Sequence, residues 1–129
     1  MLSSTTHAPP LRVLLVEDSL FNQRLLLGLL HLRNYCVTVA TDGQQAVDRM
    51  AEEEFDVVLM DVQMPVMDGL AATRLIRQQE AGTTKHTPIL AVTAGMDRQS
   101  CLEAGMDEYL EKPVRADSLQ EKLDLLLRN

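Results

Sequence analysis

The sequence predicts an open, doubly wound α/β fold in which helices cover both faces of a parallel sheet. Short runs of apolar residues alternate along the chain with longer segments in which apolar residues recur at helical spacing. The runs carry too few polar residues for strands with one face in water, so both faces of the sheet must be covered. The length of 129 residues suits one domain of this kind.

Five strands and five helices are predicted. The strands are Leu11–Val16, Cys36–Ala40, Val57–Met60, Pro88–Thr93 and Glu108–Leu110. The helices run from about Phe21 to near Asn34, from about Ala46 to Glu52, and over Gly69–Gln79, Asp97–Ala104 and Ser118–Leu127. Residues 1–10 are polar and end in two prolines, so they are predicted to form a flexible tail before a domain at 11–129.

Composition excludes several classes of protein. Lys and Arg total 12 against 19 Asp and Glu, a formal charge of −7, so a basic nucleic-acid-binding surface is not expected. Aromatic residues make up 3% of the chain, and Trp is absent, which leaves little to stack on bases. The longest apolar stretch, Leu25–Leu30, is far too short to span a membrane.

The cysteines and the N-terminus indicate a location. The first ten residues have neither the basic nor the apolar region of a secretory signal. Cys36 and Cys101 both lie in apolar segments, so we expect buried free thiols in a reducing compartment. A cytoplasmic location is therefore predicted.

Reactive side chains follow four of the five predicted strands. Glu17 and Asp18 come directly after the first strand, Asp61 ends the third, Thr93 ends the fourth, and Lys112 follows the fifth. In open α/β sheets the carboxyl ends of parallel strands share one edge, and ligands bind there. We therefore expect these side chains to converge on one crevice.

Three converging carboxylates need a compensating charge. Two unit charges 4 Å apart repel by about 4 kcal/mol at an effective dielectric constant near 20. An all-oxygen site with few protein ligands suits Mg²⁺, which keeps several waters and often shares a phosphate. The hydroxyl of Thr93 and the ammonium of Lys112 would complement phosphoryl oxygens, and Asp61 would be placed to attack phosphorus.

Several other catalytic motifs are absent from the sequence. There is no G-x-G-x-x-G after the first strand for a dinucleotide and no G-x-x-x-x-G-K-[ST] for a nucleoside triphosphate. No G-x-S-x-G nucleophile elbow is present either.

Four stretches together resemble the response-regulator receiver domain of two-component signalling. They are VLLVEDS (13–19), LMDVQMPVMDG (59–69), ILAVTA (89–94) and GMDEYLEKP (105–113). The resemblance covers roughly residues 11–128 and implies a flavodoxin-like sheet of order 2-1-3-4-5. Within the family, the chain is most similar to receivers attached to hybrid sensor histidine kinases.

By position, the resemblance implies a role for each residue of the crevice. Asp61 resembles the phosphorylated aspartate. Asp18, Asp61 and the backbone carbonyl of Gln63 resemble the Mg²⁺ ligands, and Glu17 acts through water.

The resemblance also implies a switch. Thr93 resembles the switch hydroxyl, and Lys112 resembles the lysine that contacts the phosphoryl group. Tyr109 is similar to the aromatic residue that turns inward when the threonine moves. Pro113 matches a proline that follows this lysine through a cis bond.

The function predicted is a phosphoryl-accepting switch. A phosphohistidine on a histidine kinase or a histidine-phosphotransfer domain would donate to Asp61, with Mg²⁺ required and no turnover of a metabolite. The first helix has more leucines than one buried face needs, which predicts a docking patch that includes Leu26 and Leu30. A weak homodimer through the fourth helix, fifth strand and fifth helix is also compatible with the family.

Two alternatives compete with the switch. A phosphohydrolase with an aspartyl-phosphate intermediate shares the Asp, Thr, Lys and Mg²⁺ set, but it usually needs a second carboxylate two residues after the nucleophile. That position is Gln63, which can neither protonate a leaving group nor activate water. The other alternative is a receiver-shaped module that is never phosphorylated, which the complete acidic set disfavours.

Overall fold

One parallel sheet with helices on both faces forms the computed structural model, which describes residues 9–95 and 98–127. Its strands are β1 (Arg12–Val16), β2 (Cys36–Ala40), β3 (Val57–Asp61), β4 (Ile89–Thr93) and β5 (Glu108–Glu111). They lie in the order β2-β1-β3-β4-β5, and each neighbouring pair is parallel. The predicted fold class and strand order are confirmed.

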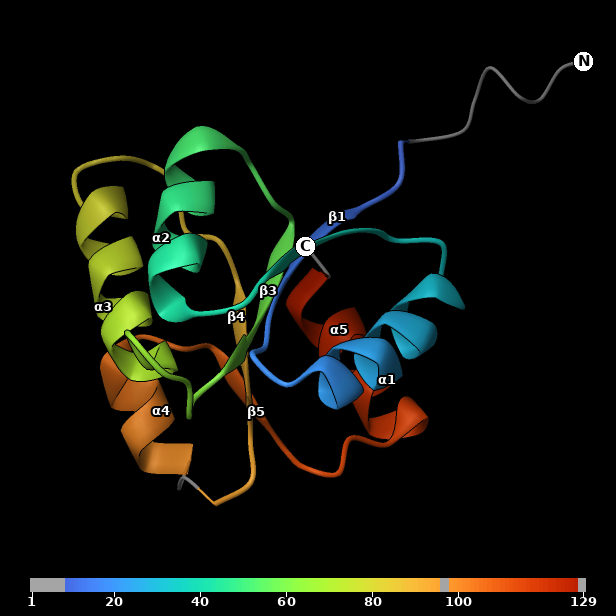
Figure 1. Cartoon of the computed structure of the whole chain (residues 1–129). Helices are drawn as coiled ribbons and strands as arrows, with labels where there is room; N and C mark the ends of the chain where they lie inside the picture. The colour runs from blue at the N-terminus through green and yellow to red at the C-terminus, as the bar shows by residue number, and fades with distance from the viewer. Residues whose placement is uncertain (1–8, 96–97, 128–129) are drawn as a thin grey trace, which may run out of the picture.

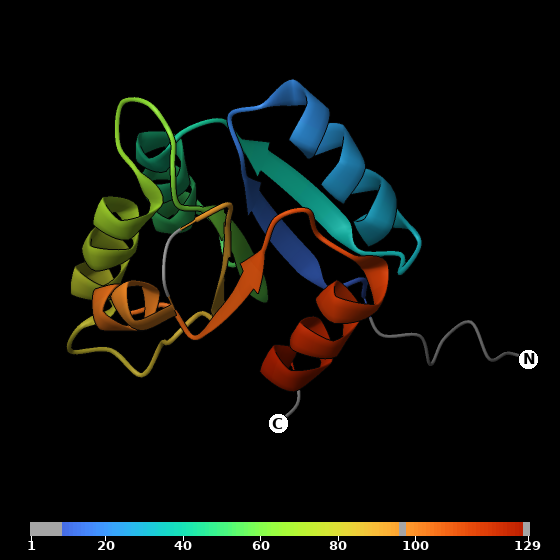
Figure 2. The ribbon, with the colours of Figure 1, turned by 90° about the horizontal axis from the view of Figure 1, so that it is seen from below.

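Helices connect consecutive strands, and the last helix follows β5. They are α1 (Leu20–His31), α2 (Gly43–Glu52), α3 (Gly69–Glu80), α4 (Arg98–Ala104) and α5 (Ala116–Leu127). Helices α1 and α5 cover one face of the sheet, and α2, α3 and α4 cover the other (Figures 1 and 2). Within the described residues, no helix combines the length and the apolar character that crossing a membrane requires.

The predicted element boundaries differ from the observed ones by a few residues at most. The largest differences are at α1, which ends at His31 before a left-handed residue at Asn34, and at α2, which starts at Gly43 instead of about Ala46. The predicted start of α4 at Asp97 and the predicted tail over residues 1–8 lie outside the described residues. Helix ends depend on capping contacts, which hydrophobic periodicity does not encode.

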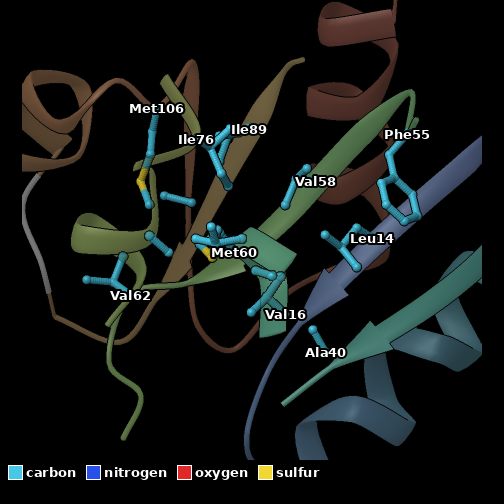
Figure 3. Close-up of a cluster of buried hydrophobic side chains, with 14 of the residues drawn as sticks. Leu14, Val16, Ala40, Phe55, Val58, Met60, Val62, Ile76, Ile89 and Met106 are labelled. Carbon is cyan, nitrogen blue, oxygen red and sulfur yellow. The ribbon is translucent and has the colours of Figure 1, made fainter. Parts of the chain in front are cut away.

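Two hydrophobic clusters sandwich the sheet because successive strand residues point to opposite faces. On the α2–α3–α4 side, Leu14 and Val16 of β1 pack with Met60 of β3 and Ile76 of α3 (Figure 3). The other cluster lies under α1 and α5 and contains Val13, Leu15, Val57, Leu59, Leu90, Val92, Leu110, Leu119 and Leu123, together with two leucines of α1. The sheet is therefore buried on both sides, as the apolar strands predicted.

The two leucines of α1 in this cluster correct one prediction. Leu26 and Leu30, which we expected in an exposed docking patch, are 2% and 0% exposed. They lie four residues apart, on the stripe of the helix that faces the sheet and α5. The exposed apolar side chains of α1 are Leu20, Phe21 and Leu25, with Leu32 just beyond its end.

The cysteine prediction is half correct. Both thiols are free, and Cys101 is buried in α4 as expected. Cys36 is exposed, because it is the first residue of β2, which lies at the edge of the sheet. An apolar sequence context alone does not distinguish an edge strand from a central one.

The start of α3 is pressed against the end of β3. Asp68 caps the helix by accepting a hydrogen bond from the Ala71 N–H at 2.8 Å. Gly69 follows it, and a Cβ atom there would lie 2.2 Å from the carbonyl oxygen of Asp61 and 2.9 Å from Cγ of Met60. A side chain at this position would therefore displace the backbone at the end of β3.

We expect Gly69→Ala to lower the free energy of unfolding by about 1 to 3 kcal/mol because of this overlap. Gly28→Ala is the matched control, because Gly28 lies inside α1 and a methyl group there would have no neighbouring atom within 4 Å. It should stabilise the protein by about 0.5 to 1 kcal/mol through helix propensity. Urea-induced unfolding measures both effects, and equal effects of the two substitutions would contradict the packing explanation.

Candidate functional site

Three carboxylates meet at the carboxyl edge of the sheet. Glu17 and Asp18 follow β1, and Asp61 is the last residue of β3, the neighbouring strand. One oxygen from each carboxylate lies within 4.8 Å of the others. Glu17 is 1% exposed and Asp61 is 5% exposed, whereas Asp18 faces solvent. Within residues 9–95 and 98–127, this is the one cluster of potential metal ligands at such short range.

Lys112 brings a positive charge to the cluster. Its Nζ lies 2.9 Å from Oε1 of Glu17 and 3.3 Å from Oδ2 of Asp61. Its backbone N–H donates to the carbonyl of Thr93 at 2.8 Å, which holds the residue after β5 beside the end of β4. The following bond, Lys112–Pro113, is cis, as the resemblance implied.

The other predicted site residues are Thr93, Gln63 and Tyr109. Thr93 is the buried last residue of β4, and its register partner on β5 is Glu111. The backbone N–H of Gln63 donates to Oδ1 of Asp61 at 3.2 Å, and its side chain is exposed. Tyr109 lies within β5, half-buried against the hydrophobic cluster that includes Met60. The predicted convergence at the sheet edge is thus found for Glu17, Asp18, Asp61 and Lys112.

Two polar residues that the sequence analysis did not single out, Ser19 and Gln23, form hydrogen bonds to Glu17. Ser19 caps α1, accepting a hydrogen bond from the Asn22 N–H, and its own backbone N–H donates to Oε2 of Glu17. Nε2 of Gln23 donates to the carbonyl of Glu17 at 2.7 Å. The role of Ser19 could have been predicted, because a serine just before an apolar helix is a common N-cap. The role of Gln23 depends on the path of the loop and had no signal in the sequence.

Burial governs the protonation of Asp61. Burial and the nearby Glu17 carboxylate raise the pKa of Asp61 to about 6, although the Lys112 ammonium and the Gln63 N–H act in the opposite direction. For Lys112, burial alone would lower the pKa. The hydrogen bond to Glu17 and the charge of Asp61 outweigh burial, so the pKa of Lys112 lies above its ordinary value. Lys112 therefore stays charged. Its ammonium only partly offsets the effect of burial and of the Glu17 carboxylate on Asp61.

The donor chemistry of the cluster fits a divalent metal ion. Three carboxylates face one ammonium, so a net negative charge remains, and two of the carboxylates, Glu17 and Asp61, are withdrawn from water. Oxygen-only donors suit Mg²⁺, and a site with few protein ligands leaves coordination positions for water and a phosphoryl oxygen. The residues available to hold such an ion are Asp18, Asp61 and Glu17.

A doubly wound sheet of order 2-1-3-4-5 with a carboxylate cluster and a lysine at its carboxyl edge defines a receiver domain. A family model described as the response regulator receiver domain matches residues 13–124, and the chain belongs to this family. Its relatives include hybrid histidine kinases. The chain is 42% identical to hybrid signal transduction histidine kinase I of Dictyostelium discoideum over 123 residues. That match covers 89% of the chain but only 7% of the length of the kinase.

Two solved structures are closely similar. The receiver domain of sensor histidine kinase PA1611 from Pseudomonas aeruginosa, solved with a magnesium ion in its active site cleft, is 41% identical with a TM-score of 0.85. The match covers 94% of this chain and 100% of that one. The receiver of Saccharomyces cerevisiae Ssk1, crystallised with the phosphotransfer protein Ypd1, is 31% identical with a TM-score of 0.80, covering 90% and 88%. The chain is thus most like receivers of hybrid kinases.

Replacing Asp61 by Asn is expected to stabilise the protein in EDTA at neutral pH. The pKa of Asp61 is raised from 3.8 to about 6, so between these values the folded protein binds a proton that the unfolded chain has released. The free energy of unfolding therefore falls as the pH rises through this window, by about 1 to 3 kcal/mol in all. The Asp61→Asn variant would not show this loss, because its carboxamide does not titrate.

Urea-induced unfolding at pH 4, 6 and 8 measures the effect. Asp48→Asn serves as the control because Asp48 is an exposed carboxylate of α2. The electrostatic interpretation is wrong if the Asp61 variant is no more stable than wild type at pH 8 in EDTA.

Proposed function

We propose that this domain accepts a phosphoryl group on Asp61 from a phosphohistidine. An oxygen of the Asp61 carboxylate forms the bond to phosphorus, the bond between phosphorus and the donor imidazole nitrogen breaks, and that nitrogen keeps the electron pair and is then protonated. The observation that carries the proposal is the placement of Lys112 within 3.3 Å of Asp61 at a buried carboxylate cluster.

Each residue of the site has a proposed task. Asp18, Asp61 and the backbone carbonyl of Gln63 would hold Mg²⁺, with Glu17 acting through water. When bound, the ion would neutralise charge on the phosphoryl oxygens. Lys112 would turn from Asp61 to a phosphoryl oxygen, since its ammonium already lies beside the accepting carboxylate. The solved PA1611 receiver, whose cleft holds magnesium, supports the choice of ion.

The signal would leave the site through Thr93 and Tyr109. Thr93 ends the strand beside β3, so its hydroxyl is the one that we expect to bond a phosphoryl oxygen. Tyr109 is half-buried on the adjoining strand β5. We propose that phosphorylation draws Thr93 toward the site and favours a pre-existing conformation in which Tyr109 is turned inward.

A phosphohydrolase is the less suitable assignment. Receivers are a family of signalling switches and not of metabolic enzymes. The residue two positions after Asp61 is Gln63, whose exposed carboxamide cannot act as a general acid or base. A module that is never phosphorylated fits less well still. Ionisation of the buried Asp61 destabilises the folded protein, and such a module would gain nothing in return for this cost.

An exposed apolar patch beside the site provides a docking surface for the phosphodonor. This α1 patch consists of Leu20, Phe21 and Leu25, and Phe21 is 75% exposed. A hollow of about 90 Å³ joins it to the site, since Phe21 and Leu25 line that hollow together with Lys112 and Pro113. We propose that a histidine kinase or histidine-phosphotransfer domain packs on this patch. The Ssk1 receiver, solved with such a phosphotransfer protein, supports this class of partner.

Location and self-association complete the proposal. A cytoplasmic location agrees with two free thiols. A weak homodimer through α4, β5 and α5 stays a prediction, which sedimentation at increasing protein concentration would measure.

Acetyl phosphate labelling tests the phosphoacceptor. With Mg²⁺ we expect one phosphoryl group per chain, lost in EDTA and in Asp61→Asn but retained in the control Asp48→Asn. Lys112→Ala should slow labelling at least tenfold, because the ammonium beside Asp61 is removed. Intact-mass measurement follows the reaction. Full labelling of Asp61→Asn would contradict the assignment, and fast release of phosphate from many phosphoesters would favour a hydrolase.

Substitutions in α1 test the docking patch. Phe21→Asp should slow transfer from a phosphorylated histidine-phosphotransfer domain by about tenfold or more, since it places a charge in an apolar interface. Leu32→Asp is the matched control, because Leu32 is as exposed but lies beyond the opposite end of α1. Labelling by acetyl phosphate should be unchanged in both variants. Equal transfer rates for Phe21→Asp and wild type would exclude this patch.

A further inference from the structure

A hollow of about 610 Å³ lies at the edge of the sheet opposite to the acidic cluster. It is bounded by the C-terminal ends of α2 and α3 and by the segment that leads into β4, which arches over these helix ends at the upper left of Figure 1. Met50, Ala51 and Ile76 form apolar parts of its wall. This volume is within the range of small-molecule sites, about 300 to 1,000 Å³. The proposed phosphorylation chemistry makes no use of it.

A buried threonine whose hydroxyl has no partner lines this hollow. Thr87 is 6% exposed, its N–H donates to Glu80 at 2.9 Å, and its carbonyl accepts from Arg77 at 2.9 Å. Its hydroxyl makes no hydrogen bond within the described residues and is not closed off from the hollow. The Thr87 hydroxyl is therefore placed to bond a ligand or water atom there.

One carboxylate on the wall is available to a cationic ligand. Glu53 and Glu80 also line the hollow, but each is paired with arginine, Glu53 with Arg12 and Arg49 and Glu80 with Arg77. Among the described residues, Glu54 pairs only with Lys85, which also lines the hollow. The pair between Glu54 and Lys85, at 3.3 Å, joins two well-exposed side chains, so it is weak and easily displaced.

We propose that this hollow binds a small organic cation, a protonated amine or guanidine carried on an apolar body. The charged group would replace Lys85 at the Glu54 carboxylate and donate to the hydroxyl of Thr87. The apolar body would cover Met50, Ala51 and Ile76. The site is separate from the phosphoacceptor, because its lining comes from the residues before β3 and β4, whereas the acidic cluster follows β1 and β3.

Three probes with the same phenyl group and a four-carbon chain test the proposal on the full chain by amide chemical shifts in solution. Phenylbutylamine should give saturable shifts at the lining residues Met50, Ile76, Thr84 and Thr87. Phenylbutanol should bind at least threefold more weakly, and phenylbutyrate should cause no saturable shift there. The proposal is overturned if the anion or the alcohol binds as tightly as the amine, or if no probe causes saturable shifts at these residues.

Matched variants locate the binding. Ala51→Trp should fill the hollow and weaken amine binding at least tenfold. Ala81→Trp, at an exposed residue of the same region that does not line the hollow, should bind like wild type. Thr87→Val should weaken binding about fivefold to tenfold and Glu54→Gln up to about fivefold. Unchanged affinity in Ala51→Trp, Thr87→Val and Glu54→Gln would overturn the proposal, and labelling of Asp61 by acetyl phosphate reports independently that each variant is folded.

Discussion

The balance of three carboxylates against one ammonium governs the carboxyl edge of this domain. Glu17 and Asp61 are withdrawn from water, and Lys112 bonds to both, yet the pKa of Asp61 still rises to about 6. The folded protein therefore holds Asp61, the proposed phosphoacceptor, in an electrostatically unfavourable state. Anything that brings positive charge to Asp61 would relieve that state. The proposed need for a metal ion and the predicted loss of stability when Asp61 ionises would therefore have the same physical origin.

The neighbouring loops are built to maintain this arrangement. Ser19 begins α1 and also holds the Glu17 carboxylate, while Gln23, one turn into the helix, holds the Glu17 carbonyl. Gly69 lets α3 begin in contact with the end of β3, where Asp61 lies. The buried leucines of helix α1 pack against the sheet, and its exposed residues Phe21 and Leu25 line a hollow beside Lys112.

The two edges of the sheet differ in chemistry although the same strands form both. At the carboxyl edge, charged groups bond directly to one another across adjacent loops. At the opposite edge, Arg77 bonds to Glu80 within α3 and joins this helix to Thr87, Gly105 and Asp107. A hollow lies between the ends of α2 and α3. A ligand at the carboxyl edge would meet buried charged groups, whereas a ligand in the hollow would meet apolar side chains and the weakly paired carboxylate of Glu54.

The sequence alone determined the fold class, because apolar runs of strand length alternating with helical periodicity leave few arrangements that bury both faces of a sheet. It also located Glu17, Asp18, Asp61 and Lys112, since residues just past parallel strands share one edge. Only the tertiary structure decided which leucines of α1 are buried, that Cys36 lies on an edge strand, and how far burial raises the pKa of Asp61. These properties depend on what packs against each side chain. Hydrophobic periodicity predicts on which face of a helix or strand a residue lies, but it does not predict which other elements pack against that face.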